Sequence, residues 1–515
     1  MALVLAVMMV LGATTAMAAT IKVNKADPTT NTHTYTVYQI FKGTVDGTTL
    51  NEITYGTSHP DYSTAANANN NVPKSLLDTL TTEATVRDYV KGLSLGTAVG
   101  TVSDDSTSGL TVDPGYYVLK DTSYTGDAND AYSAIIVQII DGEVTLNPKK
   151  QVPSVDKEVK DEADDAEAGS TDGWGETADH EIGESFQFKV TATIPAGDYS
   201  AYTTYKAEFK DTMSTGITFE KIDSVKIAGE TATGYTTKFG TNGTLQNGVK
   251  GDGSTSWTLT FANVPAVAGQ NLTEDVTIEV IYSAHLNSDA QTNNASGSTT
   301  NENSVSFVYS NNPDATGSGD TGETPEDHVW VFTYESDNTK VDANDDPVAG
   351  AKFKIFVGST TGTTAPTDEP ISLYKVGTTY YVGYTEEKAD DYPTGGSVVT
   401  EMETTADTGK FDIKGLDVGT YTLFESHVPD GYVQATNTVF TISATHSEVT
   451  DTTNNVVLKK NNVETKIEEK VVNLTGATLP STGGIGTTMF YVGGGLLALI
   501  AVVLLVTKRR VGSAE

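Results

Sequence analysis

The residue types able to do chemistry in this chain are few, and lysines and asparagines are prominent among them. The 515 residues include no cysteine and only 7 histidines. The lack of cysteine removes disulfides, thiolate metal sites and cysteine nucleophiles together. With so few histidines, ordinary hydrolytic or metal chemistry has few candidate residues. The sequence therefore argues against an enzyme acting on other molecules, and it indicates no cofactor and no metal.

Four short strings match catalytic or metal-binding patterns but lack the context that those patterns need. Residues 92–96 match a nucleophile elbow, yet they follow a helical pattern and not a strand. Residues 317–322 match a dinucleotide fingerprint without a βαβ unit. Residues 342–346 begin like a calcium loop, but Pro347 stands where glycine is required, so a hairpin turn is favoured. His180 lacks the second histidine of a zinc helix.

The chemistry that remains is an internal amide bond between a lysine and an asparagine. Burial in an apolar pocket favours the neutral, nucleophilic amine of lysine and the protonated form of a carboxyl. The neutral acid can hydrogen-bond the asparagine carboxamide and polarise its carbonyl, so that the amine attacks and ammonia leaves. Folding supplies the orientation, and the reaction is single-turnover and cofactor-free. It requires a lysine on an early strand, an asparagine on a late strand, and an Asp or Glu between them.

The elements that would position such groups are β-strands. The chain has 24 tyrosines and 15 phenylalanines together with many Val, Ile and Thr residues, which favour strands over disorder. Its length allows about three domains of ordinary size. The net charge of -36, from 32 basic and 68 acidic residues, argues against a nucleic-acid partner.

The two ends of the chain indicate an extracellular protein. Residues 3–11 are apolar and precede Ala16-Met17-Ala18, which predicts a signal peptide over 1–18 with cleavage after Ala18. No Lys or Arg precedes the apolar run, which leaves the true start open. Near the other end, residues 488–507 are apolar and long enough to span a bilayer. The basic residues 508–510 follow at once, so the C-terminus is expected on the cytoplasmic side and the rest outside.

Between the ends, strand patterns divide the chain into three segments. Regularly spaced short strands with Gly, Asn, Asp and Thr between them predict an all-β fold of three tandem immunoglobulin-like sandwiches. A polar stretch at 313–325 is interpreted as an interdomain linker. The predicted elements are strands 34–41, 115–120 and 134–140 and one helix over 74–93 in segment 19–150, strands 186–194, 257–261, 276–282 and 304–309 in segment 151–312, and strands 329–334, 351–357, 380–384, 420–425 and 438–442 in segment 326–475.

The pentapeptide Leu479-Pro480-Ser481-Thr482-Gly483 lies just ahead of the apolar span, so that residues 479–515 contain a pentapeptide, an apolar span and a basic stub in that order. This combination resembles the cell-wall sorting signal of Gram-positive surface proteins. In that family a membrane sortase cuts the Thr482–Gly483 bond and passes the Thr482 carbonyl through a thioester to an amine. An ordinary single-span membrane protein is the alternative interpretation.

Three strings of the third segment belong together: Thr339-Lys340-Val-Asp342, Pro347-Val-Ala-Gly350-Ala351-Lys-Phe353 and Tyr421-Thr-Leu423-Phe-Glu425-Ser-His-Val-Pro429-Asp-Gly431-Tyr432. With them the segment resembles the collagen-adhesin B-type domain of Gram-positive pilins, and the last string matches the E-box of that domain, Tyr-x-Leu-x-Glu-x-x-x-Pro-x-Gly-Tyr. The resemblance implies Lys340 as nucleophile and Glu425 as proton shuttle. Asn473, just before the sorting signal, is our choice of acceptor, and Asn462 is the alternative. A solvated strand-end carboxylate is the simpler interpretation of Glu425.

Four strings stand out in the second segment: Pro153-Ser-Val-Asp-Lys157, Ile182-Gly183-Glu-Ser-Phe-Gln-Phe, Phe209-Lys-Asp211-Thr212-Met-Ser-Thr-Gly216-Ile and Asn303-Ser-Val-Ser-Phe-Val-Tyr309. With them the segment resembles the middle, isopeptide-forming domain of such pilins. The resemblance implies Lys157 as nucleophile, Asp211 as acid and Asn303 as acceptor, with Lys160 as a rival nucleophile. A surface lysine in an acidic run is the simpler interpretation of Lys157.

The end of the first segment carries Asn147-Pro148-Lys149-Lys150. Backbone pilins of this family have a Tyr-Pro-Lys-Asn type motif there, whose lysine attacks the sortase–threonine acyl-enzyme of the next subunit. This chain departs from the motif at its first and last positions. Lys149 is the predicted linking lysine and Lys150 the alternative, while two plain surface lysines on a linker are the simpler interpretation.

The resemblance covers nearly the whole chain and implies a structural subunit of a covalent surface pilus. It implies these partners: class C (pilin) and housekeeping sortases, identical subunits joined head to tail, ancillary pilins, peptidoglycan and host surface receptors. A monomeric wall-anchored adhesin is the alternative from another class, because it would not need a reactive linker lysine. A secreted enzyme would need a catalytic cleft, for which the sequence offers no residues.

Overall fold

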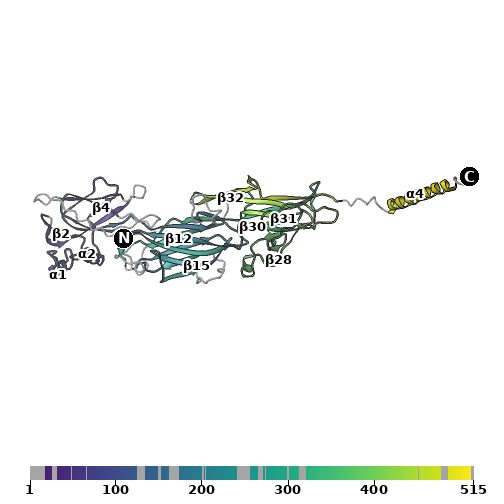
Figure 1. The fold of residues 1–515 in the computed structure, drawn as a ribbon. Coiled ribbons are helices and arrows are strands. Elements are labelled where there is room, and N and C mark those ends of the chain that lie inside the picture. The colour runs from purple at the N-terminus through teal and green to yellow at the C-terminus, as the bar shows by residue number, and fades with distance from the viewer. Residues whose placement is uncertain are drawn as a thin grey trace.

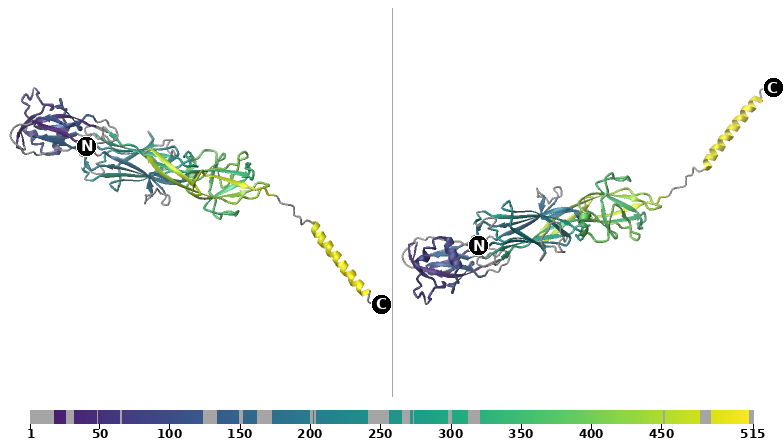
Figure 2. Two further views of the ribbon diagram at one scale, coloured as in Figure 1. Left: turned by 90° about the horizontal axis from the view of Figure 1, so that it is seen from above. Right: turned by 90° about the horizontal axis from the view of Figure 1, so that it is seen from below.

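Strands make up most of the chain, and they form three β regions that follow one another in a line. The computed structural model describes residues 18–25, 32–47, 49–64, 66–123, 134–148, 152–161, 173–199, 202, 204–240, 256–264, 271–272, 274–297, 301–311, 321–450, 452–476 and 485–511. The first region lies at one end of the molecule, and a helix extends beyond the third (Figure 1). Both views in Figure 2 show the same linear order. The predicted all-β fold of tandem sandwiches is confirmed, and the predicted signal peptide lies outside the described residues except for Ala18.

The first region pairs two sheets of alternating strands. Tyr35 and Val37 point inward from one strand and alternate with half-buried residues. The alternation breaks at a register shift, where Gln39, Ile40 and Phe41 are all buried. One sheet has the strand order β5-β1-β8, and the other has the order β3-β2-β6-β7 with β4 also paired to β2. The strands are β1 (Ala19–Val23), β2 (Thr34–Asp46), β3 (Thr49–Tyr55), β4 (Gly100–Ser103), β5 (Leu110–Val112), β6 (Gly115–Asp121), β7 (Ala134–Ile139) and β8 (Glu143–Leu146).

The single helix predicted over 74–93 is wrong, because the structure has two short helices there. They are α1 (Lys74–Leu77) and α2 (Glu83–Lys91). Thr82 and Thr85 form a capping box, in which each hydroxyl accepts a hydrogen bond from the other's backbone N–H. The hydroxyl of Thr79 also donates to the carbonyl of Leu76. Threonine side chains that bond nearby backbone therefore end one helix and begin the next.

The second region is a larger sandwich. Its sheets have the orders β10-β9-β12-β20-β15-β16 and β11-β23-β21-β14-β18-β17, with β22 paired to β21 and a small β13-β19 pair beside them. Phe188, Trp257 and Tyr282 are fully buried between the sheets. The strands are β9 (Ser154–Lys160), β10 (Trp174–Gly175), β11 (Thr177–Asp179), β12 (Ser185–Ile194), β13 (Gly197–Asp198), β14 (Ala207–Met213), β15 (Ile217–Ile227), β16 (Glu230–Thr231), β17 (Tyr235–Phe239), β18 (Ser256–Phe261), β19 (Asn271–Leu272), β20 (Val276–Leu286), β21 (Glu302–Ser310), β22 (Thr321–Glu323) and β23 (Asp327–Phe332).

The third region has sheets of order β28-β26-β27-β30-β24-β35 and β29-β25-β31-β32-β33-β34. Its first strand, β24, lies parallel to its last, β35. The elements are β24 (Tyr334–Asp342), β25 (Lys352–Val357), β26 (Leu373–Val376), β27 (Thr379–Tyr381), the 3-10 helix η1 (Glu386–Asp391), β28 (Ser397–Val399), β29 (Met402–Glu403), β30 (Asp412–Leu416), β31 (Gly419–His427), β32 (Thr438–Thr450), β33 (Thr453–Lys460), β34 (Val463–Glu464) and β35 (Glu468–Asn473).

The junction between the second and third regions lies later in the chain than the sequence boundary at 312–326. Strand β22 lies within the predicted linker and β23 within the predicted third segment, yet both pair with β21 of the second region. Strand β23 serves two cores: Val329 and Val331 pack in the core of the second region, whereas Trp330 and Phe332 pack in that of the third. Only Thr333 separates β23 from β24. The chain therefore passes from one core to the next without a flexible linker between these strands.

The C-terminal helix α4 (Ile485–Val511) stands apart from the β regions. Within the described residues, one helix is long and apolar enough to cross a membrane, over Met489–Lys508 with a mean hydropathy of 2.6. Its large apolar side chains are exposed in the folded chain. This agrees with the span predicted over 488–507.

Candidate functional site

Three residues predicted in the second region meet between its two sheets. Lys157 lies on β9 of one sheet, while Asp211 on β14 and Asn303 on β21 belong to adjacent strands of the other sheet. Their exposed fractions are 0%, 1% and 0%. Strand alternation turns all three inward, and the facing sheets bring the lysine of one against the acid of the other.

The hydroxyl of Tyr282 links these three side chains. The Lys157 ammonium donates to Asp211 Oδ2, and it also donates to the Tyr282 hydroxyl at 3.0 Å. That hydroxyl donates to Asp211 Oδ2 at 2.9 Å and accepts from Asn303 Nδ2 at 2.6 Å. The sequence analysis did not single out Tyr282. Its inward position in an alternating strand was the available signal, because a buried tyrosine hydroxyl needs a polar partner.

The surroundings shift both charged groups of this site toward their neutral forms. Burial lowers the pKa of Lys157, and the charge of Asp211 opposes that shift. Burial also raises the pKa of Asp211, against the opposing effect of Lys157. The Lys157 Nζ atom lies 5.3 Å from the ring centroids of both Phe188 and Tyr282, so the pocket is largely aromatic. Within the described part of the chain, the carbonyl oxygen of Asn303 accepts no hydrogen bond.

The rival nucleophile Lys160 lies elsewhere. It is three residues beyond Lys157 and therefore on the other face of β9. Its Nζ atom is 5.2 Å from the ring centroid of Trp174. The structure thus brings Lys157, and not Lys160, to Asp211.

The three residues predicted in the third region also meet. Lys340 on β24 pairs with Val471 of β35, two residues before Asn473, so Lys340 and Asn473 point to the same face of one sheet. Glu425 comes from β31 of the facing sheet. The exposed fractions of Lys340, Glu425 and Asn473 are 0%, 3% and 0%.

The carboxylate of Glu425 is held on both of its oxygens. Oε1 accepts from Asn473 Nδ2 at 2.9 Å, and Oε2 accepts from the backbone N–H of Ala435 at 2.8 Å. The E-box turn that returns the chain to this point has Gly431 at φ +89°, a conformation that favours glycine. The spacing of the E-box therefore reflects a turn that fixes the Glu425 side chain.

Lys340 has the electrostatic character of a nucleophile. Its Nζ atom donates to the carbonyls of Val341 at 2.9 Å and Val471 at 3.2 Å. Burial lowers the pKa of Lys340 to about 8, and the charge of Glu425 opposes this shift. An amine with that pKa is about one-tenth neutral at pH 7. The alternative acceptor Asn462 is exposed in the turn between β33 and β34, with φ +65°, and the structure does not bring it to Lys340.

Two predicted sites lie outside the described residues. They are the linking lysines Lys149 and Lys150 and the pentapeptide 479–483. Of the predicted pilin motif, the structure describes Asn147 and Pro148, and the exposed Asn147 accepts a hydrogen bond from Asn24 Nδ2 at 2.7 Å. These sites remain predictions.

The chain matches the sequence models of three families. Residues 182–313 match the Gram-positive pilin backbone subunit 2, Cna-B-like domain, and residues 336–457 match the SpaA prealbumin-like fold domain. Residues 474–511 match the LPXTG cell wall anchor motif. The Cna-B-like description thus falls on the second region, whereas the sequence analysis placed the collagen-adhesin B-type resemblance on the third.

Solved structures of pilins are similar to this chain at low sequence identity. The T6 backbone pilin of serotype M6 Streptococcus pyogenes is 16% identical with a TM-score of 0.47, over 90% of this chain and 100% of that one. The major pilin SpaD from Corynebacterium diphtheriae is 15% identical with a TM-score of 0.45, over 90% and 97%. A 35 kDa C-terminal fragment of the major pilin GBS80 of Streptococcus agalactiae is 19% identical with a TM-score of 0.40, over 63% and 100%. No curated protein matches the chain.

The family assignment rests on the three sequence models and their order along the chain. A Gram-positive pilin backbone domain and then a SpaA prealbumin-like fold domain precede an LPXTG anchor, and the anchor includes the apolar helix α4. That combination describes a surface protein held at the cell wall, with a membrane-spanning sorting signal. The chain is a Gram-positive backbone pilin that carries an LPXTG cell wall anchor.

Proposed function

We propose that this pilus backbone subunit is polymerised by sortase through Thr482 to Lys149 of the next subunit, and that two internal Lys–Asn bonds stabilise it. The observation that carries the proposal is the occurrence of the same three groups in two separate cores. Each core buries a lysine, an acid and an asparagine together. Because a buried charge is costly, a structural role alone would seldom place a lysine fully inside an apolar pocket twice in one chain.

The internal reaction follows from the contacts in the second region. A proton passes from the Lys157 ammonium to Asp211, to which it is already hydrogen-bonded. The neutral amine attacks the side-chain carbonyl carbon of Asn303 while neutral Asp211 donates to the carbonyl oxygen. The C–N bond to the carboxamide nitrogen then breaks. The attacking nitrogen gives up one of its two protons to Asp211, and Asp211 passes a proton to the departing nitrogen, which leaves as ammonia. Tyr282 holds the carboxamide in place through its bond to Asn303 Nδ2.

The third region uses Glu425 in the same role for Lys340 and Asn473. Glu425 Oε1 is already hydrogen-bonded to the nitrogen that leaves as ammonia. The charge of Glu425 raises the pKa of Lys340, against the larger effect of burial. Neither reaction needs a cofactor, and the protein needs no enzymatic activity toward other molecules.

Two observations support polymerisation: the match to the LPXTG anchor motif and the position of Lys149 in the sequence, just before the second region. Sortase cleaves after Thr482, and the amine of Lys149 takes over the acyl group. The proposed partners are a class C sortase, a housekeeping sortase that transfers the last subunit to peptidoglycan, other copies of this chain and ancillary pilins. Lys157 and Lys340 are poor acceptors for this step because both are fully buried.

The test is the covalent ladder that cells bearing this chain produce after boiling in detergent. Wild-type chain should give a ladder on a blot, and Lys149→Ala should give a single anchored band, because transfer to the wall uses the same Thr482 donor. The matched control Lys91→Ala, on α2 of the first region, should leave the ladder intact. A wild-type single band would instead support a monomeric adhesin. A ladder that survives the double change of Lys149 and Lys150 would place the linking lysine elsewhere.

A further inference from the structure

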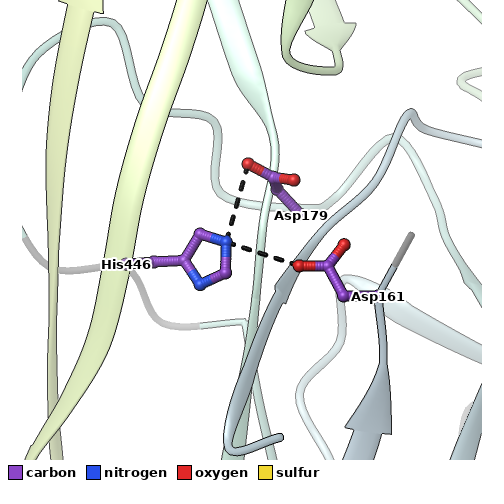
Figure 3. Close-up of side chains that lie close together, drawn as sticks. All are labelled: Asp161, Asp179 and His446. Atoms are coloured by element: carbon purple, nitrogen blue, oxygen red, sulfur yellow. Dashed lines mark ion pairs between the residues drawn. The ribbon is translucent and has the colours of Figure 1, made fainter. Parts of the chain in front are cut away.

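A buried cluster of two carboxylates and an imidazole lies where the second and third regions meet. Asp161 follows β9 and Asp179 ends β11, both in the second region, while His446 comes from β32 of the third (Figure 3). Their exposed fractions are 4%, 2% and 6%. One ligand atom from each lies within 4.8 Å of the others. The cluster takes no part in the proposed cross-links or in polymerisation.

The spacing within the cluster fits ligands of a shared ion. His446 Nε2 lies 3.5 Å from Asp161 Oδ2 and 3.8 Å from Asp179 Oδ2. Both distances exceed the usual 2.7–3.2 Å of a hydrogen bond from nitrogen to oxygen. Two ligand atoms of a tetrahedral zinc ion, each bonded at about 2.0–2.1 Å, are about 3.3 Å apart. A small inward movement of the carboxylates would complete such a site.

Hydrogen bonds with residues outside the cluster fix the positions of His446 and Asp179, as is usual for the ligands of a metal ion. His446 Nδ1 lies 2.7 Å from the hydroxyl oxygen of Thr177, which can accept the Nδ1 proton. That tautomer directs the Nε2 lone pair toward the two carboxylates, along the dashed lines of Figure 3. The Tyr334 hydroxyl donates to Asp179 Oδ2 at 2.6 Å. The other oxygen of Asp179 is buried and accepts no hydrogen bond within the described part of the chain.

The negative charge of the carboxylates in and around the cluster also favours a bound cation. Two buried carboxylates face the His446 imidazole. A second imidazole nearby, His180, pairs with Glu184 at 3.5 Å, so carboxylates still outnumber imidazoles here. Because buried charge without compensation is costly, a divalent cation would stabilise this part of the interface.

We propose that Asp161, Asp179 and His446 bind one Zn²⁺ ion, which clamps the second region of the pilin to the third. One imidazole nitrogen and two carboxylate oxygens suit zinc, and a water molecule would fill the fourth position. Calcium would need six to eight oxygen ligands, and the cluster offers fewer. Two ligands come from one region and one from the other, so the ion can bind only when the two regions are docked.

The test uses the full-length chain in detergent, stripped of metal with a chelator and titrated with Zn²⁺ by calorimetry. We expect one zinc ion bound per chain and a higher melting temperature with zinc. Asp179→Asn and His446→Ala should each abolish binding at that site. The control His427→Ala removes an exposed histidine on β31 of the same region and should leave binding unchanged.

A second variant separates a metal site from a merely structural cluster. Thr177→Val keeps the shape of the side chain but removes the hydroxyl beside Nδ1, and should weaken zinc affinity about 10- to 100-fold. If His446→Ala does not fold, this variant and Asp161→Asn carry the test. The proposal is overturned if the wild-type chain binds no zinc, or if its zinc affinity equals that of the Asp179→Asn variant. A melting temperature that depends on pH but not on zinc would identify the cluster as a protonated ion-pair network instead.

Discussion

The two buried lysines differ in how they meet their acids. Lys157 donates a hydrogen bond directly to Asp211. Lys340 instead donates to two backbone carbonyls, and the charge of Glu425 raises its pKa. In the second region, the Tyr282 hydroxyl contacts the lysine, the acid and the asparagine at once. We expect Asp211 and Glu425 each to be essential for their own cross-link, although only the second region has a tyrosine hydroxyl that joins the three groups.

Loss of either acid should therefore be visible in the intact mass of the full-length chain. Each cross-link releases one ammonia, so two cross-links should lower the mass by about 34 Da relative to the processed sequence. Asp211→Ala and Glu425→Ala should each restore about 17 Da, because no neutral acid remains to polarise the asparagine carbonyl. Mass spectrometry of the purified variants measures this directly.

The control for that measurement is Asp223→Ala. Asp223 accepts hydrogen bonds from Ser283 and Gln187 at the surface of the second region, away from Lys157. This variant should keep both cross-links. A wild-type chain of unshifted mass would contradict the cross-link proposal altogether.

At the scale of elements, the second and third regions make close backbone contact. Gly183 precedes β12, and Gly383 follows β27; both have positive φ. A Cβ atom on Gly383 would lie 1.6 Å from the carbonyl oxygen of Ile182, and one on Gly183 would lie 2.4 Å from that of Gly383. Ile182 also donates its backbone N–H to the carbonyl of Gly415 at 3.0 Å. Only glycine allows this approach.

Gly383→Ala should therefore weaken the contact between the two regions. We expect a cost of about 2–5 kcal/mol in the free energy of unfolding, from a left-handed conformation plus a steric clash. The matched control is Gly377→Ala, where φ is +60° and no atom lies within 4 Å of the added Cβ. It should cost about 1–2 kcal/mol. Denaturant unfolding of both variants compares them, and equal costs would mean that the clash is relieved without separating the regions.

A second contact between these regions is expected to depend on pH, because it includes a histidine. His285 on β20 lies between two carboxylates, with Nδ1 2.7 Å from Glu220 Oε1 and Nε2 3.0 Å from Asp391 Oδ2 of η1. Lys388 also reaches Glu220, at 3.0 Å. Burial alone would lower the pKa of His285, but its hydrogen bonds to Asp391 and Glu220 outweigh burial and raise the pKa. For the Glu220 carboxyl, burial alone would raise the pKa. Hydrogen bonds from His285, Ser185 and Lys388 outweigh burial and lower this pKa to about 2.

The pKa of His285 is higher in the folded chain than in the unfolded chain. Protonated His285 therefore makes its full contribution to the free energy of unfolding below about pH 6.5. That contribution is lost as pH rises through the raised, folded-state pKa. His285→Gln should therefore lower the melting temperature more at pH 6 than at alkaline pH. Thermal unfolding across this range, with exposed His427→Gln as the control, measures the difference. A variant whose deficit does not change with pH would show that His285 is neutral in the folded chain.

At the scale of the whole molecule, the proposed bonds lie near the two points where a pilus shaft would be pulled. Tension would enter at Lys149, shortly before β9, and leave at Thr482, shortly after β35. The Lys157–Asn303 bond joins the first strand of the second region to a late strand of the facing sheet. The Lys340–Asn473 bond joins the first and last strands of the third region, which are parallel neighbours. Force would thus bypass most of both sandwiches.

Stretching single chains between residue 149 and residue 482 should therefore produce no unfolding step in the second or third region. In the Asp211→Ala variant, residues 157–303 become free to extend, which should add a step of up to about 500 Å. The Glu425→Ala variant should add a step of similar size from the third region. If the wild-type chain extends as far as these variants, the proposed bonds do not lie in the path of the force.

Much of this protein is determined by local sequence. Alternation with a period of two predicts strands from adjacent residues alone, as in β2, β12 and β20, because each strand buries every second side chain. The order of pentapeptide, apolar span and basic stub is likewise local. The E-box is a short local string as well, and its resemblance to the family motif implied a role for Glu425, which the structure buries.

Only the tertiary structure decided the features that join distant parts of the chain. Strand β23 divides its side chains between two cores, so its own pattern does not show to which region it belongs. Tyr282 acquires its role from three strands, and Asp161, Asp179 and His446 come together across two regions. Such groups share no spacing in sequence, because their proximity results from the packing of sheets and regions and not from the periodicity of any one strand.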